Sequence, residues 1–593
     1  MKKQATIILL FFAIAVSAAG ASYAGPKVVY TSPVQGAEQV NAEENVLIRF
    51  DSDARNILDG SEIFVHGSLS GAIPYGAKVL EYGKLLLLDP LVDFSRGEVV
   101  SVTLTNKFSK ETLHAFEFTA DENPLTDKEK MNILMKVRKA EFGNDFGNEE
   151  HFSRGYSHLP ATEPQITIHV NSNPAPGTIF FGNFPQNPHI AAMKPSGQYL
   201  YAGQMPSPCY DFRLQETGLL TFFRNQEQMY FGMDSSYNIT DSFYTVNGYE
   251  TDLHELIVLP NGNYIIMSYD VKEINMSKIV PGGQKNAQVT GLIIQEIDPG
   301  RNAVFQWRSW DHFEITDADS VDLSLGVIDY CHGNAIEIDH DGNLLLSSRN
   351  MSEVTKINRI TGDKIWRLGG KNNQFTFLND TMKFSYQHAI RRTAAGTYTL
   401  FDNGNFHDPK VSMAVEYSIN ETARTCTRIW EYRNDPPIYS FAMGYVERLP
   451  NGNTSISWGF SNITYTEVTP SGQKAYEFSL ENLIYSYRVV KENWDVKPLS
   501  ISESAEEFGL IYNYPNPFNG STVIRYSVKS RSVVNLKVYD MLGREVRQLV
   551  SNETKLPGNY SVPFSSNELT SGLYFYVLES EGLTRTGKMI LLK

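Results

Sequence analysis

Residues 259–266 read LPNGNYII, an apolar residue, a Pro-Asn-Gly turn and an apolar strand. The pattern is present at residues 193–200 and 449–456, and glycine turns at Gly342 and Gly396 complete five copies. A second hairpin that typically ends in an aromatic residue follows these units. Two hairpins make a four-stranded blade, so the repeat predicts a β-propeller over residues 156–495. The chain length and the unequal spacing of the turns favour six blades, with five or seven as alternatives and with closure by strands from both ends.

Other segments flank the predicted propeller. Residues 1–24 have a basic start, an apolar run and small residues at the end, which is typical of a secretory signal peptide. Residues 25–121 alternate short apolar runs with turns and predict an immunoglobulin-like β-sandwich. Residues 122–155 predict a helical linker that Thr126 or Asp127 caps. We expect residues 496–508 to be a second linker, and the whole chain to be all-β.

Composition excludes several classes of function. The chain has 52 Lys and Arg against 67 Asp and Glu, a net charge of −15, so nucleic acid is not an expected partner. Its three cysteines form neither a disulfide framework nor a Cys-x-x-Cys zinc pattern. After the signal peptide no apolar run is long enough for a transmembrane helix.

Three histidines, His254, His332 and His388, each stand eight to ten positions ahead of one of the glycine turns. The first strand of a blade lines the central channel and starts at one mouth of it, so we expect the three imidazoles to converge at that mouth. His189 has a similar offset, and from the sequence it either lines the channel or supports it. Gly444 stands at the corresponding position of the last hairpin, where it would leave space for an aromatic substrate.

An arginine and an asparagine join this set. Arg349 lies seven positions after the turn at Gly342, and an antiparallel hairpin returns it beside His332. With Asn334 the group offers a guanidinium fork, imidazoles and an amide donor, which suit a tetrahedral oxyanion. Three histidines could also bind zinc, but the arginine would repel a divalent cation, so we expect no metal. We interpret Cys331 as a buried strand thiol rather than a reactive one.

The segments around these residues resemble the bacterial arylsulfate sulfotransferases. The matching blocks are Asp252-Leu253-His254-Glu255, Tyr330-Cys331-His332-Gly333-Asn334, Ser347-Ser348-Arg349-Asn350, Tyr386-Gln387-His388 and Phe401-Asp402-Asn403-Gly404. The resemblance implies transfer of a sulfuryl group from a phenolic sulfate ester to another phenol, without a nucleotide sulfate donor or other cofactor. It implies a sulfohistidine at His388, with His254, His332 and Arg349 holding the sulfuryl group and Asn334 as a further donor.

Residues 509–593 closely resemble the C-terminal sorting domain of the type IX secretion pathway. Their matching blocks begin with Tyr512-Asn513-Tyr514-Pro515-Asn516-Pro517 and end with Lys588-Met589-Ile590-Leu591-Leu592-Lys593. The resemblance implies that the type IX machinery is a partner, and that the protein is secreted or attached to the cell surface.

Two other classes of function compete with the transferase. One is a noncatalytic surface propeller that binds a glycan or a protein, with the histidines lining a recognition pit. The other is a sulfatase or metal-dependent phosphoesterase on the same scaffold. The matched histidines disfavour the first, and Arg349 disfavours a metal-dependent enzyme.

Overall fold

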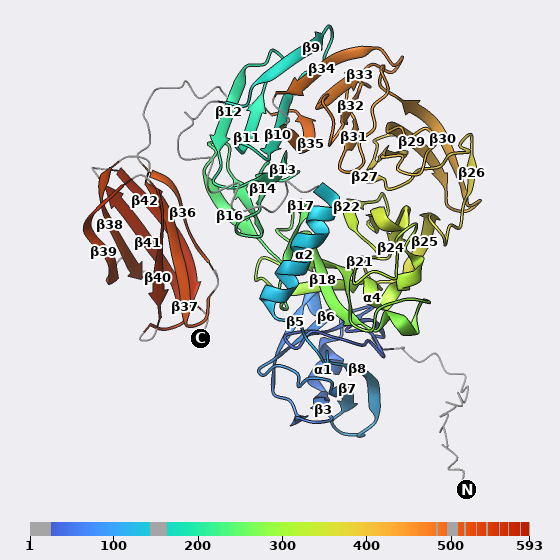
Figure 1. Cartoon of the computed structure of the whole chain (residues 1–593). Coiled ribbons are helices and arrows are strands. Elements are labelled where there is room, and N and C mark those ends of the chain that lie inside the picture. Colours follow the sequence, from blue (N-terminus) through green and yellow to red (C-terminus); the bar gives the residue numbers. More distant parts are fainter. Residues whose placement is uncertain are drawn as a thin grey trace. The chain divides into compact units, whose positions relative to one another are not determined.

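The computed structural model describes residues 25–142, 163–481, 484–494 and, with gaps at 515–517, 529–530, 541–543, 557, 567–568 and 581–582, residues 508–591. The chain divides into two compact units, Met1–Asp495 and Val496–Lys593 (Figure 1). Strands dominate both units, so the all-β expectation is confirmed. The predicted signal peptide, the second part of the helical linker and residues 496–507 lie outside the described residues. No helix in the described ranges is long and apolar enough to cross a membrane.

The first strands form two four-stranded sheets. One contains, in spatial order, β1 (Val28–Ser32), β2 (Val46–Phe50), β6 (Leu85–Pro90) and β5 (Tyr75–Leu80). The other contains β4 (Gly71–Ala72), β3 (Ser61–Gly67), β7 (Val99–Asn106) and β8 (Thr112–Thr119). Alternate residues of β7, namely Val100, Val102 and Leu104, are buried in one core with Ile48 and Leu88 of the first sheet. The short helix α1 (Arg55–Asp59) precedes β3.

Helix α2 (Asp127–Phe142) follows these sheets, where a helix is predicted. Thr126 and Glu129 cap its start, because the Thr126 backbone N–H and hydroxyl donate to the Glu129 carboxylate at 2.8 and 2.6 Å. Ile133 and Leu134 are buried in a core that includes residues of the following sheets. The helix is therefore packed against the next part of the chain.

Between residues 163 and 494 the described strands form six sheets of four or five strands. The first three, each given from the inner strand outward, are β35 (Tyr485–Glu492), β10 (Thr178–Phe184), β11 (His189–Met193), β12 (Tyr199–Gln204); β13 (Cys209–Leu214), β14 (Leu220–Arg224), β15 (Met229–Met233), β16 (Ile239–Phe243); and β17 (Thr251–Val258), β18 (Tyr264–Ile274), β19 (Ala287–Ile297), β20 (Ala303–Arg308). In the third sheet β21 (Val327–Asp329) pairs in parallel with β19, and the short helix α4 (Ser309–His312) follows β20.

The other three sheets follow the same order of strands. They are β22 (Gly333–Ile338), β23 (Leu344–Ser348), β24 (Glu353–Ile357), β25 (Lys364–Gly369); β27 (His388–Arg392), β28 (Tyr398–Asp402), β29 (Met413–Asn420), β30 (Thr425–Tyr432), β26 (Thr376–Leu378); and β31 (Tyr445–Arg448), β32 (Thr454–Ser457), β33 (Tyr465–Val468), β34 (Lys474–Leu480), β9 (Ile166–Asn171).

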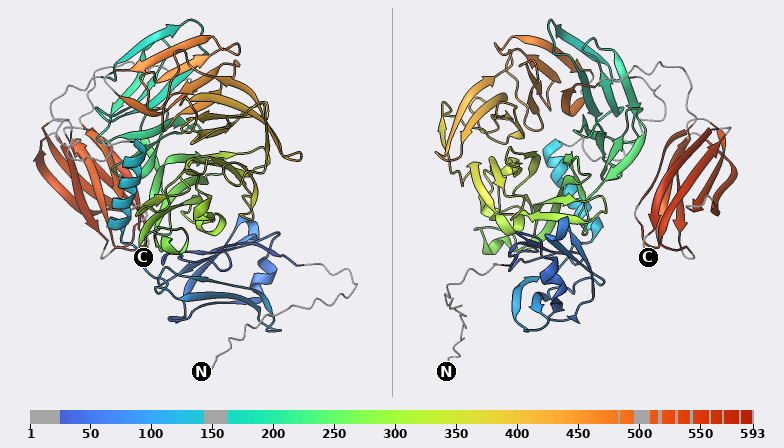
Figure 2. Two further views of the ribbon diagram at one scale, coloured as in Figure 1. Left: turned by 45° about the vertical axis from the view of Figure 1, so that its right-hand side comes forward. Right: turned by 180° about the vertical axis from the view of Figure 1, so that it is seen from behind.

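The inner strands form a closed, propeller-like ring (Figure 2). They contact one another in the cyclic order β13, β17, β22, β27, β31 and β35, and β35 contacts β13 again. Strands from the two ends of this segment join its first and last sheets. Val490 of β35 pairs with Phe180, and Ile168 of β9 pairs with Phe478. Segments distant in sequence therefore close the ring.

This closure corrects the prediction for one hairpin. Gly262, Gly342, Gly396 and Gly452 join first and second strands and have φ of 80 to 88°, where a side chain is unfavourable. The turn at Gly197, however, joins β11 and β12, the outer strands of their sheet. Because β35 supplies the inner strand of this sheet, β10 becomes its second strand, and the hairpin at Gly197 joins the third and fourth strands rather than the first and second. The turn between β13 and β14 is at Gly218 (φ 81°), which the sequence pattern missed.

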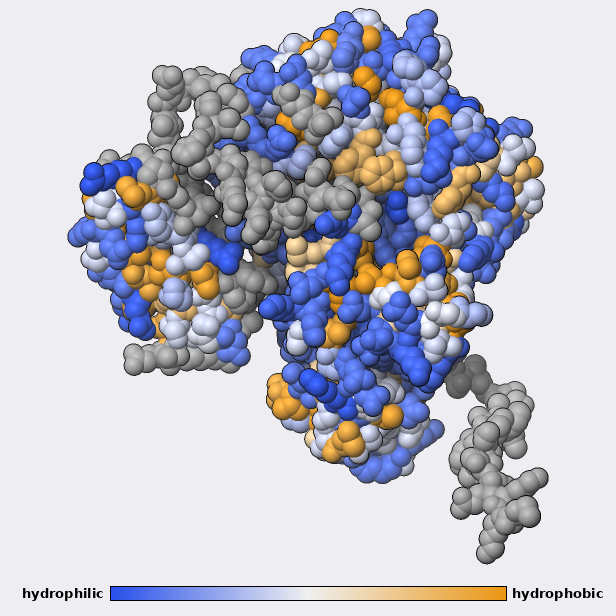
Figure 3. Space-filling model, in the orientation of Figure 1, coloured by the Kyte–Doolittle hydropathy of each residue, from blue (hydrophilic) through white to orange (hydrophobic). Residues whose placement is uncertain are grey.

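Polar residues cover most of the outer rim on the face shown in Figure 3, and hydrophobic residues gather toward the middle of the ring.

The second unit has two sheets of its own. They contain β36 (Phe508–Tyr514), β37 (Ser521–Val528) and β40 (Gly558–Ser565), and β39 (Glu545–Lys555), β38 (Ser532–Asp540), β41 (Gly572–Ser580) and β42 (Leu583–Leu591). Ile524 and Leu536 lie in one core, so residues from both sheets share it.

Candidate functional site

The three predicted histidines lie at the starts of three successive inner strands. His254 is in β17, His332 directly precedes β22 and His388 is the first residue of β27. All three are buried, at 0 to 2% exposure. In each strand the pairing register shifts close to the histidine. Such bulges change the direction of a side chain, which explains how a strand residue is presented at the channel mouth.

His254 and His332 lie side by side. Their ring centroids are 5.2 Å apart and the rings are nearly perpendicular. Two tyrosines enclose the pair: Tyr269 lies 5.8 Å from His254 and 5.6 Å from His332, and Tyr487 lies 5.5 Å from His254. The Tyr269 hydroxyl donates to the Gly333 carbonyl at 2.9 Å, which holds its ring in place.

Arg349 returns beside His332, as the hairpin geometry predicts. Its backbone N–H donates to the His332 carbonyl at 2.9 Å. The half-buried guanidinium lies 4.2 Å from the centroid of the Tyr386 ring and donates to the Phe441 carbonyl at 3.2 Å. The guanidinium also donates to the amide oxygen of Asn350 at 2.8 Å, so an aromatic face and two neutral acceptors hold the cation.

His388 joins the same cluster through two neighbours. The Asn334 amide donates to the carbonyl of Gln387 at 2.7 Å, directly before His388. The Met443 N–H donates to His388 Nε2 at 3.2 Å. Met443 lies two residues after Phe441, whose carbonyl accepts from Arg349. The structure thus gathers all five predicted residues. Asn334 uses an amide N–H to hold the backbone beside His388.

The three imidazoles differ in the group that binds Nδ1. His254 Nδ1 lies 2.6 Å from an oxygen of Asp252, and His332 Nδ1 lies 2.5 Å from an oxygen of Asp329. His388 Nδ1 instead lies 2.7 Å from the amide oxygen of Asn403. A carboxylate favours the charged imidazolium, whereas an amide oxygen does not.

The orientation of Asn403 determines the tautomer of His388. The Asn403 Nδ2 group donates to the carbonyls of Ser440 and Met443, both at 2.9 Å, so its oxygen faces the imidazole. An amide oxygen only accepts, which requires a proton on His388 Nδ1. The Met443 N–H donates to Nε2, which is therefore unprotonated. His388 is a neutral imidazole whose lone pair is on Nε2.

Helix α2 reaches the Asp252 carboxylate. Arg138 Nη2 lies 3.9 Å from Asp252 Oδ1, and both side chains are buried. A second group of the same guanidinium donates to Gln228 at 2.9 Å. Burial acts to raise the pKa of Asp252, but His254 and Arg138 outweigh it and leave that pKa lowered. Asp252 is therefore held as an anion between two cationic or potentially cationic groups.

A buried ionic cluster fills the channel next to the histidines. The Glu255 carboxylate accepts from Arg213, from Arg391 at 2.6 Å and from Arg488 at 3.1 Å, and Arg488 also binds Asp211 at 2.9 Å. Burial acts to raise the pKa of Glu255, but the three guanidinium groups outweigh it and lower that pKa. The five side chains come from four inner strands and pack the channel with charge pairs.

Arg488 also connects the ring closure to the site. It is 1% exposed, and its Nη2 donates to the carbonyls of His254 and Asn334 at 2.9 and 3.1 Å. The strand that closes the ring therefore holds the backbone of two site residues.

Two other sequence expectations for this region need correction. His189 lies in β11, the third strand of its sheet, and its Nδ1 lies 2.8 Å from the Asn187 carbonyl, so it does not join the three histidines. Gly444 leaves no space for a substrate, because a Cβ there would lie 2.2 Å from the Phe401 ring. By contrast, Cys331 is fully buried as expected, although it lies two residues before β22 rather than in a strand, and burial raises the pKa of its thiol well above the usual range.

The Nδ1 partners were not recognised from the sequence, although a signal for two residues exists. Asn403 and Tyr269 each lie seven positions after the glycine turn of their hairpin, the offset that identified Arg349. Applied to every hairpin, that rule finds both residues. Asp252 and Asp329 stand two and three positions before their histidines, so no common spacing marks them.

This arrangement can bind a compact oxyanion. Imidazole N–H groups, a guanidinium and an amide lie in one buried cluster with His388, whose Nε2 carries the lone pair. Among the described residues, no group of three His, Cys, Asp or Glu side chains is arranged to hold a metal ion.

Comparisons with known proteins agree with this chemistry. The profile of the arylsulfotransferase family matches residues 196–498, just over half of the chain. The chain belongs to the arylsulfotransferase family. The profile of the secretion system C-terminal sorting domain matches residues 513–592. This match to the sorting domain indicates that the protein is exported, and that it is secreted or lies at the cell surface.

Individual relatives of this arylsulfotransferase-family chain are distant. The arylsulfate sulfotransferase AssT of Escherichia coli O6:H1 is 28% identical over 202 residues, which cover 28% of this chain and 33% of that protein. The match therefore spans about a third of the curated relative. Among solved structures, a protein of unknown function from Bacteroides caccae has 14% identity and a TM-score of 0.35, over 53% of this chain and 100% of that one. Virginiamycin B lyase from Staphylococcus aureus has 10% identity and a TM-score of 0.29, over 62% of this chain and 96% of that one.

Proposed function

We propose that the protein transfers a sulfuryl group from a phenolic sulfate ester to another phenol through a covalent sulfohistidine at His388. No nucleotide sulfate donor or cofactor takes part. The scaffold is a six-bladed β-propeller, with the six sheets as blades, an N-terminal immunoglobulin-like sandwich and a C-terminal sorting domain that engages the type IX secretion machinery. The family match and the site geometry support this proposal.

The state of His388 is the observation that carries the assignment. A nucleophilic imidazole must be neutral and must direct a lone pair at the electrophile. Asn403 binds Nδ1 at 2.7 Å through an oxygen that only accepts, and the Met443 N–H identifies Nε2 as the basic nitrogen. The carboxylates beside His254 and His332 favour the charged form, which suits binding of an anion and donation of a proton.

In the first half-reaction, His388 Nε2 attacks the sulfur of the donor ester. An N–S bond forms while the bond from sulfur to the phenolic oxygen breaks, and the leaving oxygen keeps the electron pair. An imidazolium, which we assign to His254, gives the departing phenolate its proton. The Met443 N–H, displaced from Nε2 by the sulfur, is placed to donate to a sulfuryl oxygen.

In the second half-reaction the acceptor phenol gives its proton back to His254 and attacks the sulfur. The N–S bond then breaks, and His388 recovers its neutral state. Charge lies mainly on the peripheral and leaving oxygens in such a transfer, so fixed donors supply most of the stabilisation. Arg349, His332 and Asn334 are those donors in this proposal.

The test is a transfer assay with 4-nitrophenyl sulfate as donor, with and without a phenol acceptor. We expect acceptor-dependent release of nitrophenol that resists a chelator, and a sulfuryl mass on the His388 peptide when the donor is given alone. His388→Ala should abolish both, whereas His340→Ala, an exposed histidine on a turn, should retain both. Full activity of His388→Ala contradicts the assignment. Continuous release without an acceptor, beyond one nitrophenol per enzyme, identifies a sulfatase, and no turnover of any aryl sulfate favours a binding protein.

A further inference from the structure

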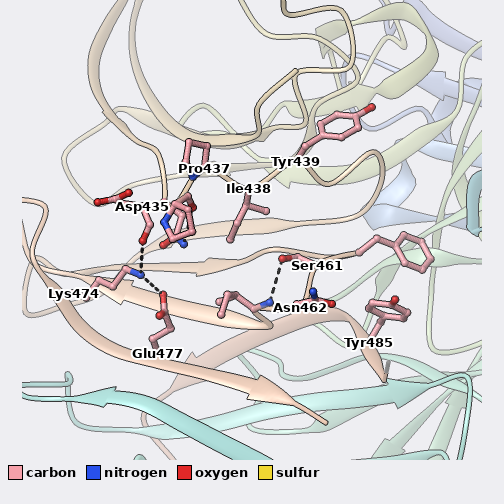
Figure 4. Close-up of a pocket in the computed structure, with 13 residues that line it drawn as sticks. Asp435, Pro437, Ile438, Tyr439, Ser461, Asn462, Lys474, Glu477 and Tyr485 are labelled. Atoms are coloured by element: carbon pink, nitrogen blue, oxygen red, sulfur yellow. Dashed lines mark hydrogen bonds and ion pairs between the residues drawn. The ribbon is translucent and has the colours of Figure 1, made fainter. Parts of the chain in front are cut away.

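Two neighbouring hollows lie beside the last sheet of the ring. Their volumes are about 470 and 430 Å³, and both are lined by Ser461, Asn462 and Tyr485. Figure 4 shows the larger one. Each is large enough for a ring-sized ligand. None of the five site residues lines them, so they are distinct from the sulfuryl site.

The hollows open on the same side of the ring as the histidines. Inner strands start at the histidine mouth and second strands return to it, as His388 and Asn403 show for β27 and β28. The segment that contains Tyr439 leads into the inner strand β31, and Phe460 follows the second strand β32. Tyr485 starts the inner strand β35. These residues therefore belong to the same mouth.

Aromatic rings connect the larger hollow to the sulfuryl site. Phe441, whose carbonyl accepts from Arg349, is 37% exposed and stacks on Phe460, with centroids 5.0 Å apart and planes 6° apart. Phe460 in turn contacts Tyr485 at 5.0 Å. Phe460 and Tyr485 line the hollow, so two ring contacts lead to its wall from Phe441, whose backbone binds Arg349.

The lining combines aromatic faces with hydrogen-bonding groups. Tyr439 and Tyr485 lie on one side, and exposed Asn462 and Asp435 offer amide and carboxylate groups, as Figure 4 shows. Lys474 is paired with Glu477 at 2.7 Å, and the second hollow adds Glu481. Carboxylates outnumber cations, so the lining disfavours a phosphate, a sulfate or another anion.

A neutral ring with several hydroxyl groups fits this lining best. Its C–H face can pack on an aromatic ring while its hydroxyls bind amide and carboxylate groups. A plain aromatic ring would displace water from the polar wall without replacing its hydrogen bonds. These are the properties of a sugar ring.

We propose that these hollows form a glycone subsite, and that the substrates are phenols that bear a sugar. The phenolic oxygen reaches the histidines and Arg349, while the sugar binds beside Asn462, Tyr439 and Tyr485. The link to sulfuryl transfer rests on the proposed function, whereas the sugar subsite itself does not.

Binding can be measured without catalysis. The probe is 4-methoxyphenyl β-glucoside, which has no phenolic hydroxyl to accept a sulfuryl group, titrated into the full chain by calorimetry. We expect saturable binding that Asn462→Ala and Tyr439→Ala each weaken about tenfold, a loss of about 1.4 kcal/mol. Ile360→Ala, which removes a 57% exposed side chain from the turn between β24 and β25, should bind as the wild type does. No saturable binding, or binding that neither subsite variant weakens, overturns the inference.

A second measurement connects the subsite to transfer. The wild type should prefer 4-hydroxyphenyl β-glucoside over 4-methoxyphenol as acceptor by about tenfold in kcat/KM, and Asn462→Ala should reduce that preference to about twofold or less. Transfer that shows no preference for the glucoside overturns the inference and leaves the proposed function in place. If the subsite variants weaken binding of the methoxy probe but no aryl sulfate is turned over, the subsite is supported and the proposed function is overturned.

Discussion

His388 and the pair His254 and His332 occupy equivalent places in the ring and have different partners. Each stands at the bulged start of an inner strand, yet a carboxylate binds Nδ1 in the pair and an amide oxygen binds it in His388. The backbone position therefore brings an imidazole to the mouth, and the neighbour on Nδ1 determines its charge. In the proposed mechanism, one scaffold thereby supplies both a neutral nucleophile and cationic donors.

Removing each imidazole is the strongest test of this difference. His388→Ala should lower kcat/KM by at least about 10⁴-fold because the nucleophile is lost, and His254→Ala by about 10²-fold because other donors remain. Single-turnover release of nitrophenol separates the two, since His254→Ala should still accumulate the sulfohistidine, only more slowly. Equal losses in the two variants, with no covalent species in either, would contradict the unequal roles.

Exchanging the partner of His388 should have the next largest effect. Asn403→Asp places a carboxylate where the amide stands, favours the imidazolium and so withdraws the lone pair on Nε2. We expect kcat/KM at neutral pH to fall by about 10²-fold and to recover as the pH rises, with the acidic limb of the profile shifted upward.

The matched control is Asn405→Asp, which makes the same charge change two residues away, where the Asn405 amide binds the Phe441 carbonyl at 3.1 Å. The acidic limb of its pH profile of kcat/KM should shift less than that of Asn403→Asp. If kcat/KM of Asn403→Asp is reduced by the same factor at every pH, Asn403 only supports the fold.

The sequence predicted where the imidazoles would meet but not what holds them. A regular hairpin repeat determines at which end of the ring a residue lies, and this was enough for the three histidines, for Arg349 and for the all-β class. Bulges break that regularity at His332 and His388, and no periodicity reports them. Asp252 lies where the register of β17 shifts, and Asp329 ends β21, a strand outside the hairpin repeat. The misassigned turn at Gly197 has a related cause, because β35 pairs with β10 across the whole domain.

The helix before the ring should tune His254 through Asp252. Arg138→Gln removes a buried cation 3.9 Å from Asp252, so the negative charge on that carboxylate then acts more fully on His254. A more strongly held imidazolium gives up its proton less readily, and we expect kcat to fall by about three- to tenfold with KM nearly unchanged. Lys139→Gln, an exposed change on the same helix, serves as the control. A change confined to KM, or to melting temperature, would show that Arg138 acts on binding or folding alone.

The smallest effect concerns stability, and it arises in the channel rather than at its mouth. Burial raises the pKa of Glu447 to about 8 and the pKa values of Glu337 and Glu492 to about 7, in contrast to Glu255, which three arginines keep ionised. A carboxyl whose pKa is higher in the folded state binds its proton more tightly there. Between about pH 4.5 and pH 8 the folded protein therefore holds more protons than the unfolded chain, and the free energy of unfolding falls as the pH rises. Glu447→Gln keeps the shape of the protonated side chain and has no proton to lose. We expect the decrease in melting temperature from pH 5.5 to pH 8.5 to be smaller in this variant than in the wild type. An equal decrease in both would mean that Glu447 is already ionised beside Arg391 and Arg213, and that the channel cluster is held by charge pairs alone.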